Sequence, residues 1–210
     1  MSSYNSSSQP PAPSPSPALE ILAYPHPTLR HKSKPLRRVD AELKQMVSEM
    51  FELMYASKGI GLAANQVDLP LRFFILNLSG KQGEGEEMVF LNPVISFPKG
   101  SEEAEEGCLS LPGLYANVIR PKQVRVNAYS LDGKEFHADV TGLLGRCIQH
   151  ETDHLDGVLF TDRMNPTART DIAYDLHEFE TAFESSRSTG SIPSDEQIAA
   201  RLADLERKYT

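Results

Sequence analysis

Residues 149–154 have the sequence Gln149-His150-Glu151-Thr152-Asp153-His154. On a helix, residues four apart share one face, so both imidazoles can bind one metal ion while Glu151 points to its open position. Apolar residues around this stretch recur at spacings of three and four, which favours a core-facing helix over a solvated one. They are Leu143, Leu144, Cys147, Ile148 and Leu155. Because buried imidazoles need partners, we expect a metal-binding helix from about Thr141 to Gly157.

The third metal ligand separates the classes of hydrolase that use this motif. In one metalloprotease class the motif continues through a glycine to a third histidine; here Gly157 fits but Phe160 replaces the histidine, which excludes that class. In another class the ligand is a carboxylate of a later helix. Asp171, Asp175 and Glu178 keep that peptidase alternative open. A metal-binding protein without catalytic activity is a third hypothesis.

Two further segments have unusual compositions. Gly59-Ile60-Gly61-Leu62-Ala63-Ala64-Asn65-Gln66 combines two glycines with small residues. This indicates either a close approach of the backbone to another group or a helix end followed by a loop. Glu106-Gly107-Cys108-Leu109-Ser110 places a cysteine before a short apolar run, which alone is typical of an ordinary buried cysteine.

In this order, the three segments resemble the signatures of the peptide deformylases, G-x-G-x-A-A-x-Q, E-G-C-x-S and Q-H-E-x-D-H. The resemblance extends from about Leu19 to about Arg163. It implies a hydrolase that removes the N-formyl group from the formyl-methionine of nascent polypeptides and releases formate. It also implies the roles of the site residues: Cys108, His150 and His154 as metal ligands, Glu151 as catalytic acid/base, and Gln66 with the backbone N–H of Leu109 as donors to the carbonyl oxygen.

The same resemblance, with the helix spacing, predicts how a peptide is held. An extended nascent chain pairs with the strand-like segments around Gly61 and Leu114–Tyr115. The pocket for the first side chain is lined by Ile60, Leu143, Cys147 and the ring of His150. Some deformylases carry an arginine near the position of Tyr115, and in its absence we expect Arg120 to offer charge to the downstream end of the peptide.

The expected cofactor is one divalent metal ion per chain. A cysteine with two histidines binds zinc well, and also Fe²⁺, nickel and cobalt. The resemblance favours Fe²⁺, and such a site should be sensitive to oxygen. Cys108 and Cys147 are the only two cysteines. We favour a ligand plus a core cysteine over a disulfide, because intracellular chains rarely keep one.

Composition predicts a soluble globular protein. The chain has 210 residues, 40% of them apolar, and a formal net charge of −8, enough for one domain with a sizeable core. No segment approaches the ~20 consecutive apolar residues of a membrane span. Residues 1–18 are mostly Ser and Pro, without the basic and apolar regions of a secretory signal, and no Arg precedes Arg30. We expect a disordered tail over 1–18 and a cytoplasmic location.

The remaining pattern predicts an α+β fold, with antiparallel sheets packed around the central metal-binding helix. Asp40 caps a helix that runs to about Lys58 and is ended by Gly59. Strands are expected over 72–78 and 88–97, separated by a polar loop, and over 123–131 and 134–140 as a hairpin around Asp132-Gly133. Helices are expected over about 167–185 and 195–208. We therefore divide the chain into the tail, a deformylase domain over 19–165 and a helical extension over 166–210.

The extension is acidic. From Pro166 onward it holds five basic and nine acidic residues, a local net charge of −4. Such a segment is a poor electrostatic partner for RNA, so we predict no sequence-specific nucleic-acid binding. A transient ribosome contact would use another face. We expect the extension to pack onto the domain or onto a second copy of the chain.

Overall fold

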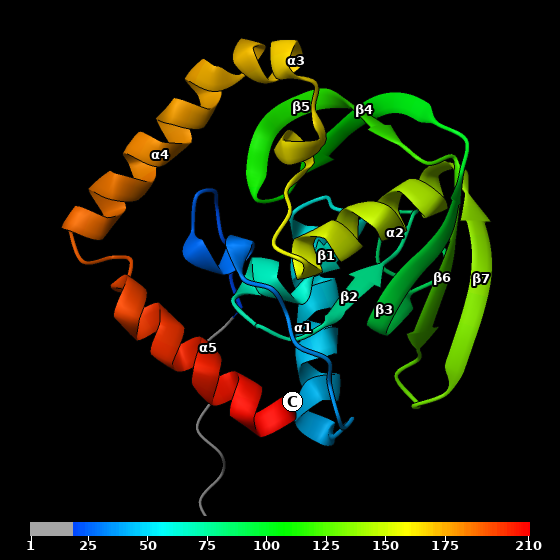
Figure 1. The fold of residues 1–210 in the computed structure, drawn as a ribbon. Coiled ribbons are helices and arrows are strands. Elements are labelled where there is room, and N and C mark those ends of the chain that lie inside the picture. The colour runs from blue at the N-terminus through cyan, green and yellow to red at the C-terminus, as the bar shows by residue number, and fades with distance from the viewer. Residues whose placement is uncertain (1–18) are drawn as a thin grey trace, which may run out of the picture.

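The computed structural model describes residues 19–210, and the prediction of a disordered tail lies outside the described residues. Helix α2 (Gly142–Leu155) lies centrally, between two antiparallel sheets (Figure 1). The larger sheet has the order β1-β2-β3-β6-β7, with strands β1 (Gly61–Ala63), β2 (Phe73–Leu76), β3 (Met88–Lys99), β6 (Gln123–Tyr129) and β7 (Glu135–Thr141). The smaller sheet pairs β4 (Glu102–Cys108) with β5 (Leu111–Arg120). The α+β prediction is confirmed.

Helix α2 begins and ends where the sequence predicts. Thr141 is its N-cap residue, and Gly157 follows it with φ +73°. A Cβ on Gly157 would lie 2.4 Å from the carbonyl oxygen of Arg30, so both its conformation and its surroundings require glycine. Ile148 and Leu155 are fully buried against the larger sheet. The helix is therefore fixed in position by its apolar face and by its tightly packed C-terminal end.

Helix α1 (Ala41–Ala56) packs on the opposite side of the β1 and β2 strands. Asp40 caps it as predicted, accepting a hydrogen bond from the N–H of Leu43 at 2.9 Å. The predicted end at about Lys58 is two residues too late. Lys58 itself, not Gly59, takes the left-handed conformation, with φ +58°. Gly59 is instead held close to the side chain of Leu109, where an added Cβ would lie 2.6 Å from Leu109 Cδ1.

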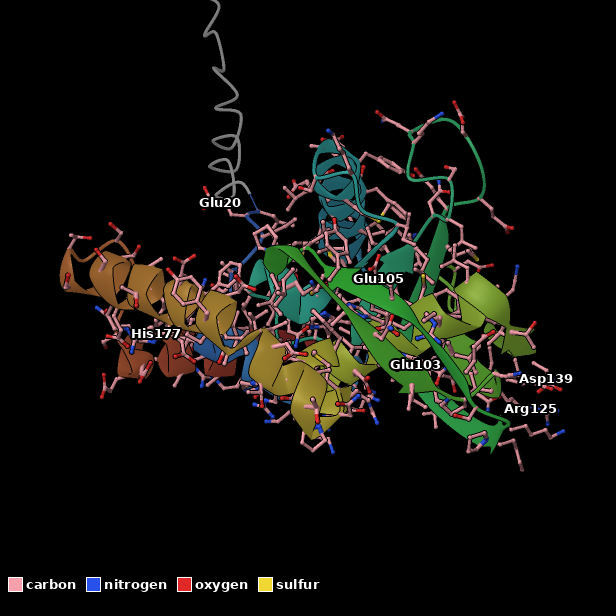
Figure 2. The ribbon with its side chains drawn as sticks, turned by 90° about the horizontal axis from the view of Figure 1, so that it is seen from above. Glu20, Glu103, Glu105, Arg125, Asp139 and His177 are labelled. Carbon is pink, nitrogen blue, oxygen red and sulfur yellow. The ribbon has the colours of Figure 1, made fainter. Side chains whose placement is uncertain are left out.

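The sequence predicts only a part of the β4–β5 pair, the strand-like segment around Leu114–Tyr115, which belongs to β5. Four glutamates in seven residues disfavour a strand by propensity, and Pro112-Gly113 suggests a turn. In the structure the glutamates divide between the two faces of β4. Glu103 and Glu105 lie on the outer surface (Figure 2), whereas Glu106 is buried against α2. The other strands lie within a few residues of their predicted ranges, and Gly133 takes φ +79° in the predicted hairpin turn.

The C-terminal extension contains three helices where two were predicted. The expected helix over 167–185 is divided at Ile172 into α3 (Pro166–Asp171) and α4 (Ala173–Ser188). Helix α5 (Asp195–Tyr209) returns to the N-terminal end of α1 (Figure 1). There the ring of Tyr209 is 1% exposed, within the core cluster of α1, and Glu206 accepts hydrogen bonds from His31 and Lys34 at 2.8 and 2.7 Å. The extension packs onto the domain, as expected, while the boundary at residue 165 stays a prediction.

None of the helices within residues 19–210 combines the length and the apolar composition that crossing a membrane requires. Short 3-10 helices connect the larger elements: η1 (Pro27–Arg30), η2 (Ala64–Val67) and η3 (Phe160–Arg163). Among them, η2 matters most for the site, because it directly follows β1 and lies against the C-terminal half of α2.

Candidate metal centre and active site

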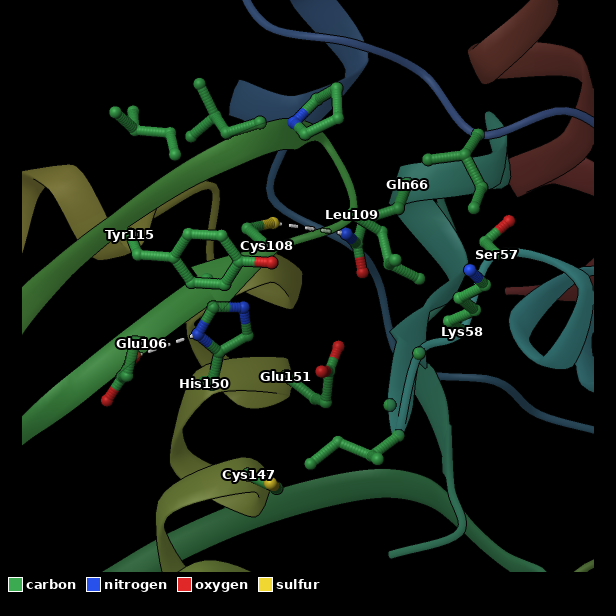
Figure 3. Close-up of a pocket in the computed structure, with 18 of the residues that line it drawn as sticks. Ser57, Lys58, Gln66, Glu106, Cys108, Leu109, Tyr115, Cys147, His150 and Glu151 are labelled. Atoms are coloured by element: carbon green, nitrogen blue, oxygen red, sulfur yellow. Dashed lines mark hydrogen bonds and ion pairs between the residues drawn. The ribbon is translucent and has the colours of Figure 1, made fainter. Parts of the chain in front are cut away.

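The three signature segments meet at one cavity of about 720 Å³ between α2, β1 and the turn that joins β4 to β5 (Figure 3). Ten of the eleven predicted site residues line it: Ile60, Gly61, Gln66, Cys108, Leu109, Tyr115, Leu143, Cys147, His150 and Glu151. The eleventh, His154, lies one helical turn beyond His150 and is 1% exposed. The structure therefore brings together side chains that lie between Ile60 and His154 in the sequence.

Cys108, His150 and His154 form a group that can hold a metal ion. One nitrogen or sulfur atom from each lies within 4.8 Å of the others, and Cys108 Sγ is 3.2 Å from His154 Nε2. It is the one such group of His, Cys, Asp or Glu side chains found among residues 19–210. The downstream carboxylates of the peptidase alternative lie on α3 and α4, outside this group. The third ligand position is thus offered by a thiol, as the resemblance implies.

Glu106 orients His150. The ring Nδ1 of His150 donates to Glu106 Oε2 at 2.9 Å, which turns Nε2 toward Cys108 and the cavity (Figure 3). Burial acts to lower the pKa of His150, but the contacts with Cys108 and Glu106 outweigh it and raise this pKa to about 10. The cluster therefore favours a positive charge at this point, and a divalent ion supplies one more strongly than a proton does.

Glu106 is the centre of a buried ionic network. Arg120 donates to both of its carboxylate oxygens, at 2.6 and 2.9 Å, and Arg146 of α2 donates at 2.7 Å. Burial would raise the pKa of Glu106, yet the hydrogen bonds from His150 and Arg120 lower it well below its usual range. Arg120 also donates to Asp153 at 2.7 Å and is only 2% exposed. The expectation that Arg120 offers charge to the peptide is therefore wrong: its guanidinium is turned inward and fully paired.

Glu151 has the properties of an acid/base group. It is 5% exposed, and its Oε2 has no hydrogen-bond partner among the described residues. Burial raises the pKa of Glu151 to about 7, although the charges of His150 and Arg120 act to lower it. A Cβ on Gly61 would lie 2.4 Å from Glu151 Oε1, so the second glycine of the first signature makes room for this carboxylate. A carboxyl group with such a pKa can both accept and return a proton near neutral pH.

Gln66 presents its amide nitrogen to the cavity. Its Oε1 accepts from the N–H of Ala63 at 2.9 Å, which fixes the orientation of the amide. Nε2 then donates to Ser110 Oγ at 3.1 Å and lies 3.5 Å from Cys108 Sγ. Leu109 lies between Cys108 and Ser110 in the same turn (Figure 3). Gln66 Nε2 therefore lies beside one predicted metal ligand, Cys108, and Leu109 follows that ligand in the chain.

The residues predicted to hold the substrate line the mouth and the inner part of the cavity. Gly61 belongs to β1, an edge strand of the larger sheet that pairs only with β2. The ring of Tyr115, 63% exposed, covers Gly107, where an added Cβ would lie 2.6 Å from the ring. Leu143 is 55% exposed at the first turn of α2, so it is a pocket residue and not part of the core stripe. Cys147 is buried one turn further along the helix.

Both cysteines are free thiols, in agreement with the preference for a ligand and a core cysteine over a disulfide. Burial, together with the charge of Glu151, raises the pKa of Cys147 to about 12. Cys147 is therefore a neutral apolar wall of the cavity, whereas Cys108 faces the two histidines.

Sequence reasoning missed three groups that support the site: Arg120, Arg146 and the carboxylate of Glu106. A ligating histidine usually donates its second N–H to a carboxylate, so a partner for His150 was to be expected. The chain has 29 acidic residues, however, and spacing alone did not identify the one that reaches the ring. The position of Glu106 two residues before Cys108 was the available signal, because the two side chains of a strand separated by one residue share a face.

The fold and this Cys-His-His group define a metal-dependent hydrolase. The sequence profile of the polypeptide deformylase family matches residues 18–170. A peptide deformylase of Rhodopirellula baltica is 51% identical over 192 residues, which cover 91% of this chain and 96% of the relative. The chain therefore belongs to the polypeptide deformylase family, enzymes whose known activity is the deformylation of nascent peptides.

Solved structures agree with this assignment. The crystal structure of a plant peptide deformylase superimposes with a TM-score of 0.80 at 40% identity, covering 87% of this chain and 98% of the other. Peptide deformylase from Thermotoga maritima gives a TM-score of 0.66 at 37% identity, covering 70% and 98% of the two chains. The resemblance drawn from the three signatures is confirmed.

Proposed function

We propose that this chain hydrolyses the N-formyl group of formyl-methionine at the N-terminus of nascent polypeptides and releases formate. One divalent ion, held by Cys108, His150 and His154, serves the reaction. The observation that carries the proposal is the position of Glu151: an unpartnered buried carboxylate lies in the same cavity as the group of potential ligands.

The residues present fit a metal ion. Two imidazoles and a thiol make a donor set suited to Zn²⁺, Fe²⁺, Ni²⁺ or Co²⁺. The thiol of Cys108 and the carboxylate of Glu106, whose contacts raise the pKa of His150, also favour a cation at this point of the cavity. When bound, such an ion supplies a Lewis acid that polarises a carbonyl oxygen and acidifies water. We propose Fe²⁺ as the working ion, following the family resemblance.

Protons would move through Glu151. As a carboxylate it accepts a proton from the attacking water, and as a carboxylic acid it returns that proton to the α-amine that leaves. Burial raises its pKa to about 7 in the metal-free protein, which favours proton transfer in both directions near neutral pH. The amide of Gln66 and the N–H of Leu109 donate to the carbonyl oxygen as it gains negative charge. Loss of one such donor typically lowers the rate by roughly a hundredfold or more.

The peptide would bind as an added strand. Because β1 pairs with β2 on one side only, and the carbonyl of Ile60 already accepts from the N–H of Asn77, the backbone of Gly61 is what an extended chain can pair with on the cavity side. Backbone pairing tolerates many downstream sequences. The pocket formed by Ile60, Leu143, Cys147 and the ring of His150 would select an unbranched apolar first side chain. Tyr115 would cover the peptide from the β5 side, without the arginine that some deformylases carry there.

Formate release from a formyl-Met tripeptide tests the proposal. Protein purified without oxygen and loaded with Fe²⁺ is compared with Glu151→Gln, which keeps the shape of the side chain but cannot accept the proton. Rapid release by the wild type and its loss in the variant, with metal still bound, are expected. The N-acetyl tripeptide is the matched substrate control. Equal release by both proteins would refute the role of Glu151.

The peptidase alternative makes different predictions. If a downstream carboxylate were the third ligand, Cys108→Ala would hold its ion as tightly as the wild type and internal peptide bonds would be cut. We expect Cys108→Ala to lose the ion and to release no formate. Loading with Zn²⁺, Ni²⁺ and Co²⁺ in turn ranks the metals. The cytoplasmic location and a transient ribosome contact remain predictions from the sequence.

A further inference from the structure

We propose that Asn65 is a positioning residue for His154: its side-chain oxygen accepts a hydrogen bond from His154 Nδ1, directly or through one water molecule, and so fixes the ring for metal binding. This inference rests on the proposed function only in taking His154 as a metal ligand. Asn65 occupies a position that the first signature, G-x-G-x-A-A-x-Q, leaves open. Its role is therefore a property of this chain and not of the signature.

The two histidines of the group differ in their support. His150 donates its Nδ1 proton to Glu106 at 2.9 Å. His154 has Nε2 beside Cys108 Sγ, but its Nδ1 is buried without a hydrogen-bond partner among the described residues. When Nε2 binds an ion, the neutral ring must carry its proton on Nδ1. A buried N–H without an acceptor is costly. The ring of His154 therefore needs an acceptor, as the ring of His150 has in Glu106.

Asn65 has the matching unpaired atom. Its Nδ2 donates to the main-chain carbonyl oxygen of His154, and its Oδ1 is buried without a partner. Only the NH₂ end of an amide can donate to a carbonyl, so this contact decides which end of the side chain is the acceptor. An unpaired acceptor and an unpaired donor therefore belong to two residues that already touch. Asn65 and His154 are 0% and 1% exposed, which leaves little other solvation for either atom.

The position of Asn65 in the backbone also supports this role. It lies in η2 between Ala64, fully buried in the core, and Gln66, whose amide faces the cavity. The same short helix thus presents the amide of Asn65 to a metal ligand and the amide of Gln66, the next residue, to the carbonyl of the substrate. A partner that orients a ligating histidine typically contributes 10–100-fold to metal affinity.

Metal affinity of the full-length chain tests this role without an activity assay. Metal-free protein is titrated with Co²⁺ against a chromophoric chelator, and the cobalt–thiolate absorption of Cys108 reports that the ion is in the site. Asn65→Leu removes both polar atoms and keeps the number and branching of the side-chain heavy atoms. We expect its Kd for Co²⁺ to rise about 10–100-fold. A Kd within about threefold of the wild type in folded Asn65→Leu overturns the proposal.

Asn65→Asp separates positioning of the ring from support of the fold. It keeps an acceptor oxygen for Nδ1 but, like the leucine variant, cannot donate to the carbonyl of His154. We expect both variants to be less stable to urea, yet only Asn65→Leu to lose metal affinity. Equal losses of Co²⁺ affinity in the two variants would mean that Asn65 serves only the backbone. Should the leucine variant not fold, Asn65→Ala takes its place with the same expected rise in Kd, and unchanged affinity in folded Asn65→Ala overturns the proposal.

Ser33 provides the matched control. Its N–H donates to the carbonyl of Leu155 at 2.9 Å, and its hydroxyl is also buried and unpartnered. We expect Ser33→Ala to bind Co²⁺ like the wild type; a tenfold loss there, with none in Asn65→Leu, would assign the ring to Ser33. If the wild type itself bound no Co²⁺, the proposed function would fail. If the wild type binds Co²⁺ and folded Asn65→Leu binds it equally well, only the positioning role of Asn65 is rejected.

Discussion

Neutralising Glu151 should stabilise the metal-free enzyme at alkaline pH. Burial raises the pKa of Glu151 from its ordinary value of 4.5 to about 7. The folded protein therefore binds this proton more tightly than the unfolded chain does. The stability associated with that proton is fully present below pH 4.5 and is lost as the pH rises through about 7. The difference between a pKa of 4.5 in the unfolded chain and about 7 in the folded protein corresponds to about 3 kcal/mol at most.

The comparison of Glu151→Gln with the wild type isolates this effect. Both proteins are unfolded with urea after removal of metal, and circular dichroism follows the transition from pH 4.5 to 8.5. We expect the variant to gain up to about 3 kcal/mol relative to the wild type by pH 8.5, and little or nothing at pH 4.5. Glu103→Gln, on the exposed face of β4, is the control and should stay within about 0.5 kcal/mol at every pH.

Two results would count against this reasoning. Parallel pH profiles of the wild type and Glu151→Gln would show that the carboxyl group is not held protonated by its surroundings. A stability difference between Glu151→Gln and the wild type that falls as the pH rises would contradict the expected direction. Loading with a divalent ion offers a further check: a nearby cation favours the ionised carboxylate, so the gain of the variant at pH 8.5 should shrink.

Three further predictions follow from buried contacts. Tyr209→Ala should lose about 3–5 kcal/mol of stability in urea unfolding, because the ring is 1% exposed in the α1 core, whereas Tyr209→Phe keeps the packing and should lose far less. Glu106→Gln should weaken metal binding about 10–100-fold by chelator competition, since the carboxylate orients His150; unchanged affinity would remove that role. Gly61→Ala should lower kcat about a hundredfold or more with normal circular dichroism. The added methyl group would lie 2.4 Å from Glu151 Oε1 and must displace it. Full activity would show that the carboxylate can move freely.

The metal helix could be predicted from the sequence because its signals are local. The three-to-four spacing of apolar residues, Thr141 at the start and Gly157 at the end all lie within one segment, and the observed helix agrees with them. The ligands follow from motif spacing on that helix and from resemblance. Helix α1 was predicted equally well except at its end, where the conformation of Lys58 depends on tertiary packing that propensity does not describe.

The β4–β5 pair and the two arginines that bind Glu106 could not be predicted in the same way. Whether a glutamate of β4 faces water or the interior depends on a cation fourteen residues later, on another strand. Arg120 was accordingly expected at the surface, near the peptide, and lies instead beneath the site. Asn65 presents the same difficulty, because nothing in an eight-residue signature indicates that its amide reaches the far end of α2.

Glu106 is difficult to explain by stability alone. Burying one carboxylate with two guanidinium groups costs desolvation that their attraction does not reliably exceed, and a well-packed apolar cluster of the same volume is often as stable or more so. The network does, however, join β4, β5 and α2 through one carboxylate, which also takes the Nδ1 proton of His150. Any displacement of the β4–β5 pair, which carries Cys108 and Leu109, would then move a ligand on α2 with it. The buried charges are best explained by function: they fix the positions of the thiol, the imidazoles and the carbonyl donor relative to one another, although they do not make the fold more stable.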